Sequence, residues 1–298
     1  MSLSINDLNV WIGDAHILRG ITLEVPDGQH VGIIGSSGSG KSMLSLAIMG
    51  LLPEGARVEG SIRWGDRELV GASERELRSL RGSQISMMFQ DPATSLDPLM
   101  RLGKQIALPL RRHRGLRGAA LREAIDRALA EVALPDPARV ARSFPYEVSG
   151  GQRQRVALAM TLAASPSLLI ADEPTTALDV TVQRTVLDLL DEVTRERGVI
   201  LLFISHDLPV VARMADRVIV VDAGRITDDV PVEVIRTAPD TLSDSARSIA
   251  SAARALDSVF ERIGAVRPDS QTGHALDEAG EREGEPASST DNEGNAHE

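Results

Sequence analysis

The sequence of 298 residues contains no cysteine. That absence excludes disulfide bonds, zinc sites with cysteine ligands and iron–sulfur clusters held by cysteine. Aromatic residues are scarce at 2%, so leucine, valine, isoleucine and alanine must pack most of the core. The sequence shows no signal-peptide pattern, and its longest strongly apolar run, Val199 to Ile204, is too short to span a bilayer. We therefore expect a protein whose membrane role, if any, depends on partners.

Negative charge is concentrated near the C-terminal end. The formal net charge is −11, and residues 265–298 carry nine acidic and two basic residues, a net of −7. The rest of the chain then carries −4 (−11 minus −7), which is ordinary for a globular domain. This distribution predicts no nucleic-acid partner. The composition of residues 265–298 predicts an acidic, disordered tail.

Short apolar runs alternate with helical stretches along residues 1–235. Such alternation predicts an α/β fold, with a mostly parallel sheet and helices on both faces. Residues 1–34 and 58–70 have the alternating pattern of strands, which predicts an antiparallel β subdomain. A helical, Arg-rich block at about 91–160 interrupts the alternation and predicts an inserted α-helical subdomain.

A glycine-rich run, GSSGSGKS, follows an expected buried strand and opens an expected helix. It fits the pattern G-x-x-x-x-G-K-[S/T] without a mismatch. Its glycines let backbone N–H groups turn onto phosphate oxygens, while Lys41 would reach the β- and γ-phosphates and Ser42 would ligate Mg²⁺. A flexible linker is the competing interpretation, which the flanking strand and helix disfavour. The expected nucleotide-binding residues here are Gly35, Ser36, Ser37, Gly38, Ser39, Gly40, Lys41, Ser42 and Met43.

Two carboxylates follow another apolar strand in LLIADEP. A phosphate loop needs a carboxylate at the end of a neighbouring strand, and Asp172 could hold the metal there. Glu173 could polarise the attacking water as a general base. Taken alone, the run could equally be a strand that ends in a solvated turn.

The run VSGGQRQR, Val148 to Arg155, offers a second helix terminus that could face a phosphate. Ser149 can cap a helix that begins near Gln152, and Gly150 and Gly151 leave the backbone open to an anion. A simple helix cap is the competing interpretation.

With these runs the sequence resembles the ABC ATPase family, in which VSGGQRQR corresponds to the signature motif. Gln90 matches the Q-loop, Asp172 and Glu173 the Walker B motif, Ala177-Leu178-Asp179 the D-loop, and His206 the switch. The resemblance implies a RecA-like phosphate-loop core that binds ATP and Mg²⁺. Two such subunits would pair head to tail around each ATP.

Specific roles follow from the same resemblance. Ser149, Gly150, Gly151 and Gln152 of one subunit would face the phosphate loop of the other. His206 would contact the γ-phosphate, Gln90 would sense the metal and the water, and Asp179 would communicate across the dimer. Gln90 could otherwise be a solvated loop residue, and an isolated His206 could be a strand-end histidine bonded to backbone.

The adenine platform departs from the family pattern. Family members usually place an aromatic residue immediately before a glycine in the first hairpin, and that position is Ile12 here. Trp11 stands one position earlier, where adjacent strand residues face opposite sides. We expect Trp11 to stack on adenine with the help of a local bulge, with core packing as the alternative.

Three longer runs resemble the oligopeptide, dipeptide and nickel importer branch of the family. They are Ser45 to Pro53, Met87 to Pro98 and Ile170 to Gln183. This resemblance implies two transmembrane permease subunits, a second ATPase subunit in a heterodimer, and an extracytoplasmic solute-binding protein. It places the chain peripherally, on the cytoplasmic face of the cell membrane. An accessory ATPase of carbon–phosphorus lyase resembles this branch closely and is the alternative function.

Residues 236–264 predict a helical extension. Ile249, Ala253, Leu256, Phe260 and Ile263 fall on one helical stripe. The stripe predicts either packing on the chain's own domain or a contact with a partner. Members of the importer branch often carry a cysteine-rich extension with an iron–sulfur cluster, which this sequence cannot build.

Overall fold

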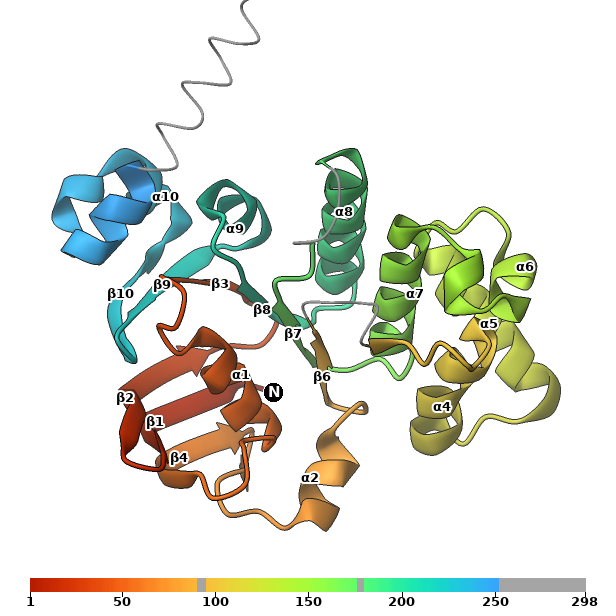
Figure 1. The fold of residues 1–298 in the computed structure, drawn as a ribbon, viewed down its shortest axis with the longest axis horizontal. Helices are drawn as coiled ribbons and strands as arrows, with labels where there is room; N and C mark the ends of the chain where they lie inside the picture. Colours follow the sequence, from red (N-terminus) through yellow and green to blue (C-terminus); the bar gives the residue numbers. More distant parts are fainter. Residues whose placement is uncertain (90–94, 176–179, 252–298) are drawn as a thin grey trace, which may run out of the picture. The chain divides into compact units, whose positions relative to one another are not determined.

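The computed structural model describes residues 1–89, 95–175 and 180–251, and their strands form two sheets (Figure 1). The smaller sheet is antiparallel, in the order β2-β1-β4-β5. Its strands are β1 (Leu3–Ile12), β2 (Ala15–Val25), β4 (Arg57–Trp64) and β5 (Arg67–Glu68). The predicted antiparallel subdomain is thereby confirmed.

The larger sheet has six strands in the order β10-β9-β3-β8-β7-β6. Every neighbouring pair is parallel except β9 with β10, which are joined by a turn. The order places β3 between β8 and β9, although β3 is far from both of them in the sequence. The strands are β3 (His30–Ile34), β6 (Ile85–Met88), β7 (Leu168–Asp172), β8 (Ile200–Ile204), β9 (Arg217–Asp222) and β10 (Arg225–Pro231).

The core lies on both faces of this larger sheet. All residues of β3, β7 and β8 are buried, as expected for parallel strands covered by other elements on both sides. Their alternate residues divide between two hydrophobic clusters: Leu201 and Phe203 belong to one, and Ile200, Leu202 and Ile204 to the other. Successive side chains of a strand point to opposite faces of the sheet, so each apolar side chain joins the hydrophobic cluster on its own face.

Nine α-helices and two 3₁₀-helices have assigned bounds in the described ranges, in addition to the helical residues 244–251. Four of them, α4 to α7, pack against one another as the helical subdomain (Figure 1). The helices are α1 (Lys41–Met49), α2 (Glu74–Leu80), α4 (Leu102–Arg114), α5 (Gly118–Glu131), α6 (Pro137–Arg142), η1 (Pro145–Glu147), α7 (Gly150–Leu162), α8 (Val180–Glu196), α9 (Leu208–Met214), α10 (Val232–Thr237) and η2 (Pro239–Thr241). None of the helices in this part of the chain is both long and apolar enough to cross a membrane.

The described part of the C-terminal extension packs on the domain that precedes it. Residues 244–251 are helical, and Leu242, Ala246 and Ala250 are buried in the main hydrophobic cluster, with Ile249 packed against it. The rest of the predicted stripe and the acidic tail lie outside the described residues. So does the second compact unit of the chain, residues 259–298.

Candidate functional site

The glycine-rich run forms a tight loop between β3 and α1. A Cβ atom at Gly35 would lie 2.0 Å from the carbonyl oxygen of Val221, so only glycine fits where the loop leaves the sheet. Gly40 is the N-cap of α1, with φ of 109° and no side chain that caps the helix. The first backbone N–H groups of α1 therefore keep their hydrogen-bonding capacity for an anion.

Lys41 is folded back under this loop. Its Nζ atom donates hydrogen bonds to the carbonyl oxygens of Gly35, at 2.8 Å, and Ser36, at 2.9 Å. Burial lowers the pKa of Lys41, and the charges of Glu173 and Asp172 oppose that shift. The ammonium group thus lies among oxygen atoms of the phosphate loop, where phosphate oxygens could replace the carbonyl acceptors.

Asp172 ends β7 next to the phosphate loop. Its side chain is buried and accepts a hydrogen bond from the Ser42 hydroxyl. Burial raises the pKa of Asp172 above its ordinary value, and the Ser42 hydrogen bond and the charge of Lys41 act in the opposite direction. A buried carboxylate beside a hydroxyl and a lysine is a suitable ligand for a cation.

The oxygen donors at this point fit Mg²⁺. Ser42 and Asp172 already lie in hydrogen-bonding contact, and Mg²⁺ is bound in proteins through few side chains together with water and substrate phosphates. Among the described residues no group of three His, Cys, Asp or Glu side chains could hold a metal. An ion here would therefore depend on phosphate oxygens and water for the remainder of its shell.

Glu173 has a left-handed backbone with φ of 48°, which costs a residue with a side chain about 1–2 kcal/mol. The backbone is held there because the Glu173 N–H donates to the carbonyl oxygen of Ile204 at 2.9 Å. This turn directs the carboxylate toward the end of β8, where Glu173 Oε1 lies 3.1 Å from His206 Nδ1. The predicted base and the predicted switch histidine are therefore in contact.

Strand order is what brings these groups together. β3, β8 and β7 are neighbours and run parallel, so the segments that follow them leave the sheet at the same edge. Those segments carry Lys41, His206 and Glu173 respectively. Ligands of open α/β sheets bind at this carboxyl edge.

Two cavities open beside the phosphate loop. One, of about 480 Å³, is lined by residues 37–43, Glu173, His206 and Ile17 of β2. The other, of about 510 Å³, shares Ser37 and His206 with it and reaches the helical residues 244–249. Sequence reasoning missed Ile17 and the helical residues, because neither has a local pattern that marks it as part of a site.

The signature run lies at the start of α7, in the helical subdomain. Ser149 Oγ accepts from the Gln152 N–H at 3.2 Å, and Gln152 Oε1 accepts from the Ser149 N–H at 3.1 Å. This reciprocal cap starts the helix at Gly150, so the predicted start near Gln152 was two residues late. Residues 149–152 line neither of the two cavities beside the phosphate loop.

Trp11 lies between two neighbours on the antiparallel sheet. Its ring stacks on His16, with centroids 4.3 Å apart, and the guanidinium carbon of Arg57 lies 4.1 Å from the ring centroid. These partners come from β2 and β4, the strands on either side of β1. The pairing of β1 with β2 shifts register between Val10 and Trp11. Trp11 does not line either phosphate-loop cavity, and Gln90 and Asp179 lie outside the described residues.

Residues 18–176 match the family model described as ABC transporter. The chain belongs to the ABC transporter family. It is an ATP-binding and ATP-hydrolysing subunit of that family, and the fold predicted from the sequence is confirmed.

This ABC transporter subunit is similar to ATP-binding proteins of peptide transport. The oligopeptide transport ATP-binding protein OppD of Salmonella typhimurium is 46% identical over 227 residues, which cover 75% of this chain and 68% of that protein. The dipeptide transport ATP-binding protein DppD of Bacillus subtilis is 42% identical over 232 residues, covering 76% and 69%.

Solved structures of ABC cassettes share the fold. The dimeric cassette MJ0796, bound to ADP and phosphate in a post-hydrolysis state, superimposes with a TM-score of 0.67 at 28% identity and covers 77% of this chain and 98% of its own. CbiO1 of Clostridium perfringens, part of the cbiONQ transporter complex, gives a TM-score of 0.69 at 25% identity, with coverage of 89% and 97%.

Proposed function

We propose that this chain is the ATPase subunit of an importer for peptides or a related small solute, nickel included. The observation that carries the proposal is the 46% identity to an oligopeptide transport ATP-binding protein over three quarters of the chain. The phosphate loop, the adjacent carboxylates and the strand-end histidine supply the chemistry that such a subunit requires.

In this proposal each of the described site residues has a distinct role in ATP hydrolysis. The loop N–H groups and Lys41 bind the β- and γ-phosphates. To do so, the Lys41 ammonium group exchanges the carbonyl oxygens of Gly35 and Ser36 for phosphate oxygens. Glu173 accepts a proton from the attacking water, and its contact with His206 keeps the carboxylate directed at the γ-phosphate. Gln90 is proposed to report on the metal and the water.

Ser42, Asp172 and Gln90 are the proposed side chains around Mg²⁺. When bound, this ion supplies positive charge next to the β- and γ-phosphate oxygens. Ser42 and Asp172 then act as fixed oxygen ligands, already oriented toward each other by their hydrogen bond.

The functional site is proposed to need a second subunit. Ser149, Gly150 and Gly151 belong to a capped helix start in a different subdomain from Lys41, so we infer that they serve the phosphate loop of a partner. ATP then acts as a ligand between subunits and favours the closed dimer by its higher affinity for that state. Asp179 is proposed to connect the two sites, and the partner is a different ATPase chain.

The remaining partners follow from the importer function. We propose two transmembrane permease subunits and an extracytoplasmic solute-binding protein, with this chain peripheral at the cytoplasmic face of the membrane. No nucleic-acid partner is proposed.

Co-purification from native membranes tests this assembly. The tagged full chain is expected to recover two integral membrane proteins and a second ATPase in comparable amounts, because all four form one complex. Mass spectrometry of gently solubilised membranes measures this, with an untagged strain as the control. Recovery of soluble phosphonate-processing proteins without any permease would overturn the importer.

Trp11 is proposed as the support for adenine, which requires His16 or Arg57 to move from the ring. Trp11→Ala is expected to weaken ATP binding by about 1–3 kcal/mol, because base–aromatic stacking contributes that much. Trp11→Phe keeps a ring and should keep most of the affinity. Fluorescent ATP titration measures the effect. An unchanged Kd in Trp11→Ala would assign Trp11 to the stack with His16 and Arg57 alone.

A further inference from the structure

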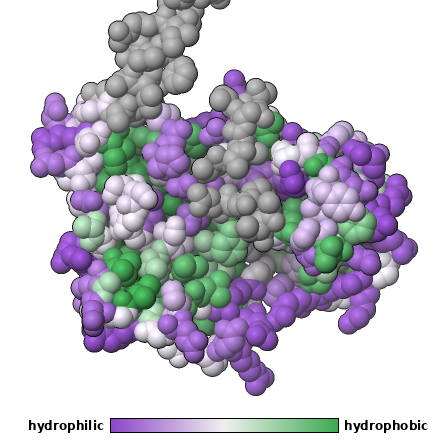
Figure 2. All heavy atoms as spheres, in the orientation of Figure 1, coloured by the Kyte–Doolittle hydropathy of each residue, from purple (hydrophilic) through white to green (hydrophobic). Residues whose placement is uncertain are grey.

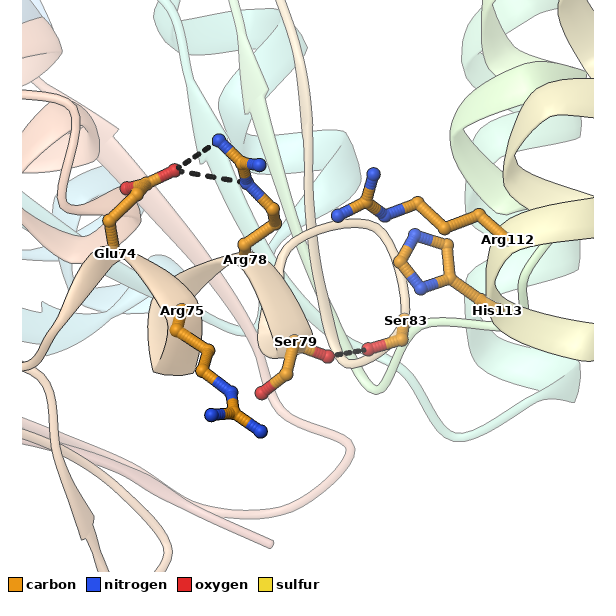
Figure 3. A pocket seen from close by; sticks show the side chains of 7 residues that line it. All are labelled: Glu74, Arg75, Arg78, Ser79, Ser83, Arg112 and His113. Carbon is orange, nitrogen blue, oxygen red and sulfur yellow. Dashed lines mark hydrogen bonds and ion pairs between the residues drawn. The ribbon is translucent and has the colours of Figure 1, made fainter.

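A basic cavity lies away from the phosphate loop, between α2 and the C-terminal turn of α4. Its volume is about 770 Å³, and its lining includes Arg75 and Arg78 of α2 and Arg112 and His113 of α4 (Figure 3). Figure 2 shows mostly hydrophilic side chains over α2, and hydrophilic side chains with hydrophobic patches between them over the helical subdomain. None of the motifs that define the ATP site contributes to this cavity.

The charges in the cavity are unbalanced. Its lining holds three arginines and one carboxylate, Glu74, which gives a net of +2 with His113 neutral. Glu74 is already engaged, because Arg78 lies 3.3 Å from its carboxylate and Arg81 lies 2.9 Å from it. Within the described ranges, the Arg112 side chain has neither an ion-pair nor a hydrogen-bond partner.

The arrangement brings like charges toward one another. Figure 3 shows the Arg112 side chain reaching from α4 toward the guanidinium of Arg78, with the His113 ring below it and Arg75 pointing elsewhere. Guanidinium groups repel each other unless an anion lies between them. Their planar forks of N–H donors match the oxygen atoms of a phosphate group.

The His113 ring packs closely against Gly82 at the wall of this cavity. Gly82 has φ of 79°, and a Cβ atom there would lie 2.9 Å from His113 Nε2. The pKa of His113 is lowered by burial and by the charge of Arg112. The hydroxyl groups of the two serines in the lining already donate hydrogen bonds within the chain. Ser83 Oγ donates to the Ser79 carbonyl oxygen at 2.6 Å, and Ser79 Oγ donates to the Glu76 carbonyl oxygen at 2.6 Å. These serines therefore form part of the cavity wall and do not supply donors to a ligand.

We propose that the cavity between α2 and α4 is a second anion site, which binds a phosphate group between Arg78 and Arg112 beside His113. This inference is independent of the proposed transport function. The phosphate group could belong to a soluble phosphorylated compound or to an anionic lipid headgroup, and the chemistry of recognition is the same for both.

Histidine NMR separates this site from the phosphate loop within one sample. Inorganic phosphate is titrated into the full chain, and the His113 and His206 ring signals are assigned with His113→Asn and His206→Asn. A phosphate bound in the cavity is expected to raise the pKa of His113, because the anion favours the imidazolium, whereas His206 reports on the phosphate loop. A shift of His206 alone would overturn the proposal.

Substitutions at the end of α4 supply the matched comparison. Arg112→Gln is expected to weaken the phosphate effect on His113 by about fivefold, as for an exposed charge pair, and Arg112→Glu should abolish it. Arg111→Gln and Arg111→Glu are the controls, because Arg111 is on the same helix but lines a different cavity. Equal responses in the Arg111 and Arg112 variants would contradict the assignment.

Vesicles distinguish the two sources of phosphate. If the ligand is a lipid headgroup, phosphatidylglycerol vesicles should sediment more wild-type protein than Arg112→Glu, with Arg111→Glu close to wild type and phosphatidylcholine without effect. If phosphate moves His113 but vesicles do not discriminate, the ligand is a soluble phosphorylated compound. If His113 responds to neither probe, the proposal of an anion site is wrong. Protection of His113 only in the complex with a permease would then identify the cavity as a protein contact.

Discussion

Glu173→Gln is expected to lower the rate of ATP hydrolysis by about 10²–10⁴-fold, because the amide cannot accept the proton of the attacking water. ATP affinity should stay near that of the wild type. The backbone at Glu173 is held by a hydrogen bond from its own N–H to Ile204, which the substitution leaves in place. Steady-state phosphate release and equilibrium ATP binding measure the two effects separately.

The same variant should accumulate as an ATP-bound closed dimer with its partner chain, since only hydrolysis opens it. Glu123→Gln is the matched control, because it replaces the same carboxylate by the same amide at an exposed position on α5. Multiple turnover at the wild-type rate would remove Glu173 as the base. A parallel loss of ATP affinity would instead point to damage of the whole site.

The second large effect is expected from Lys41→Ala, which should weaken ATP binding by roughly 10- to 100-fold, the range of one charge-assisted hydrogen bond. Lys41 is the buried cation of the loop and is held by two carbonyl oxygens. Its removal also leaves Asp172 and Glu173 without the positive charge that offsets their repulsion of phosphate. Isothermal titration with ATP measures the loss.

The chain offers a natural control for this experiment. Its other lysine, Lys104, is exposed on α4 and lines a cavity remote from the phosphate loop, so Lys104→Ala should bind ATP like the wild type. Thermal unfolding of both variants checks that they fold. Unchanged ATP affinity in Lys41→Ala would contradict the phosphate-loop role.

Local patterns in the sequence were sufficient to predict most elements. The apolar runs of β3, β7 and β8 are short and continuous because both faces of a central parallel strand are buried. The phosphate loop could be recognised because its glycines, its lysine and its place between strand and helix lie within about ten residues. The start of α7 was placed two residues late, because the pattern did not show that Ser149 and Gln152 cap each other.

Other features depend on contacts between distant segments. No local pattern shows that His206 touches Glu173 or that Trp11 lies between His16 and Arg57. The basic cavity arises only because the end of α4 lies opposite α2, with Gly82 leaving space for His113. Each of these contacts joins residues of different elements.

The sequence by itself therefore determined the family, the α/β class and the phosphate-binding chemistry of residues 35–42, since backbone sterics and hydrogen bonding act over a few residues. Tertiary structure alone decided that β3 lies between β8 and β9, and with it that Glu173 and His206 contact each other beside the phosphate loop. Strand order is set by the packing of whole faces of the sheet, a sum over many distant side chains that no short run of residues contains.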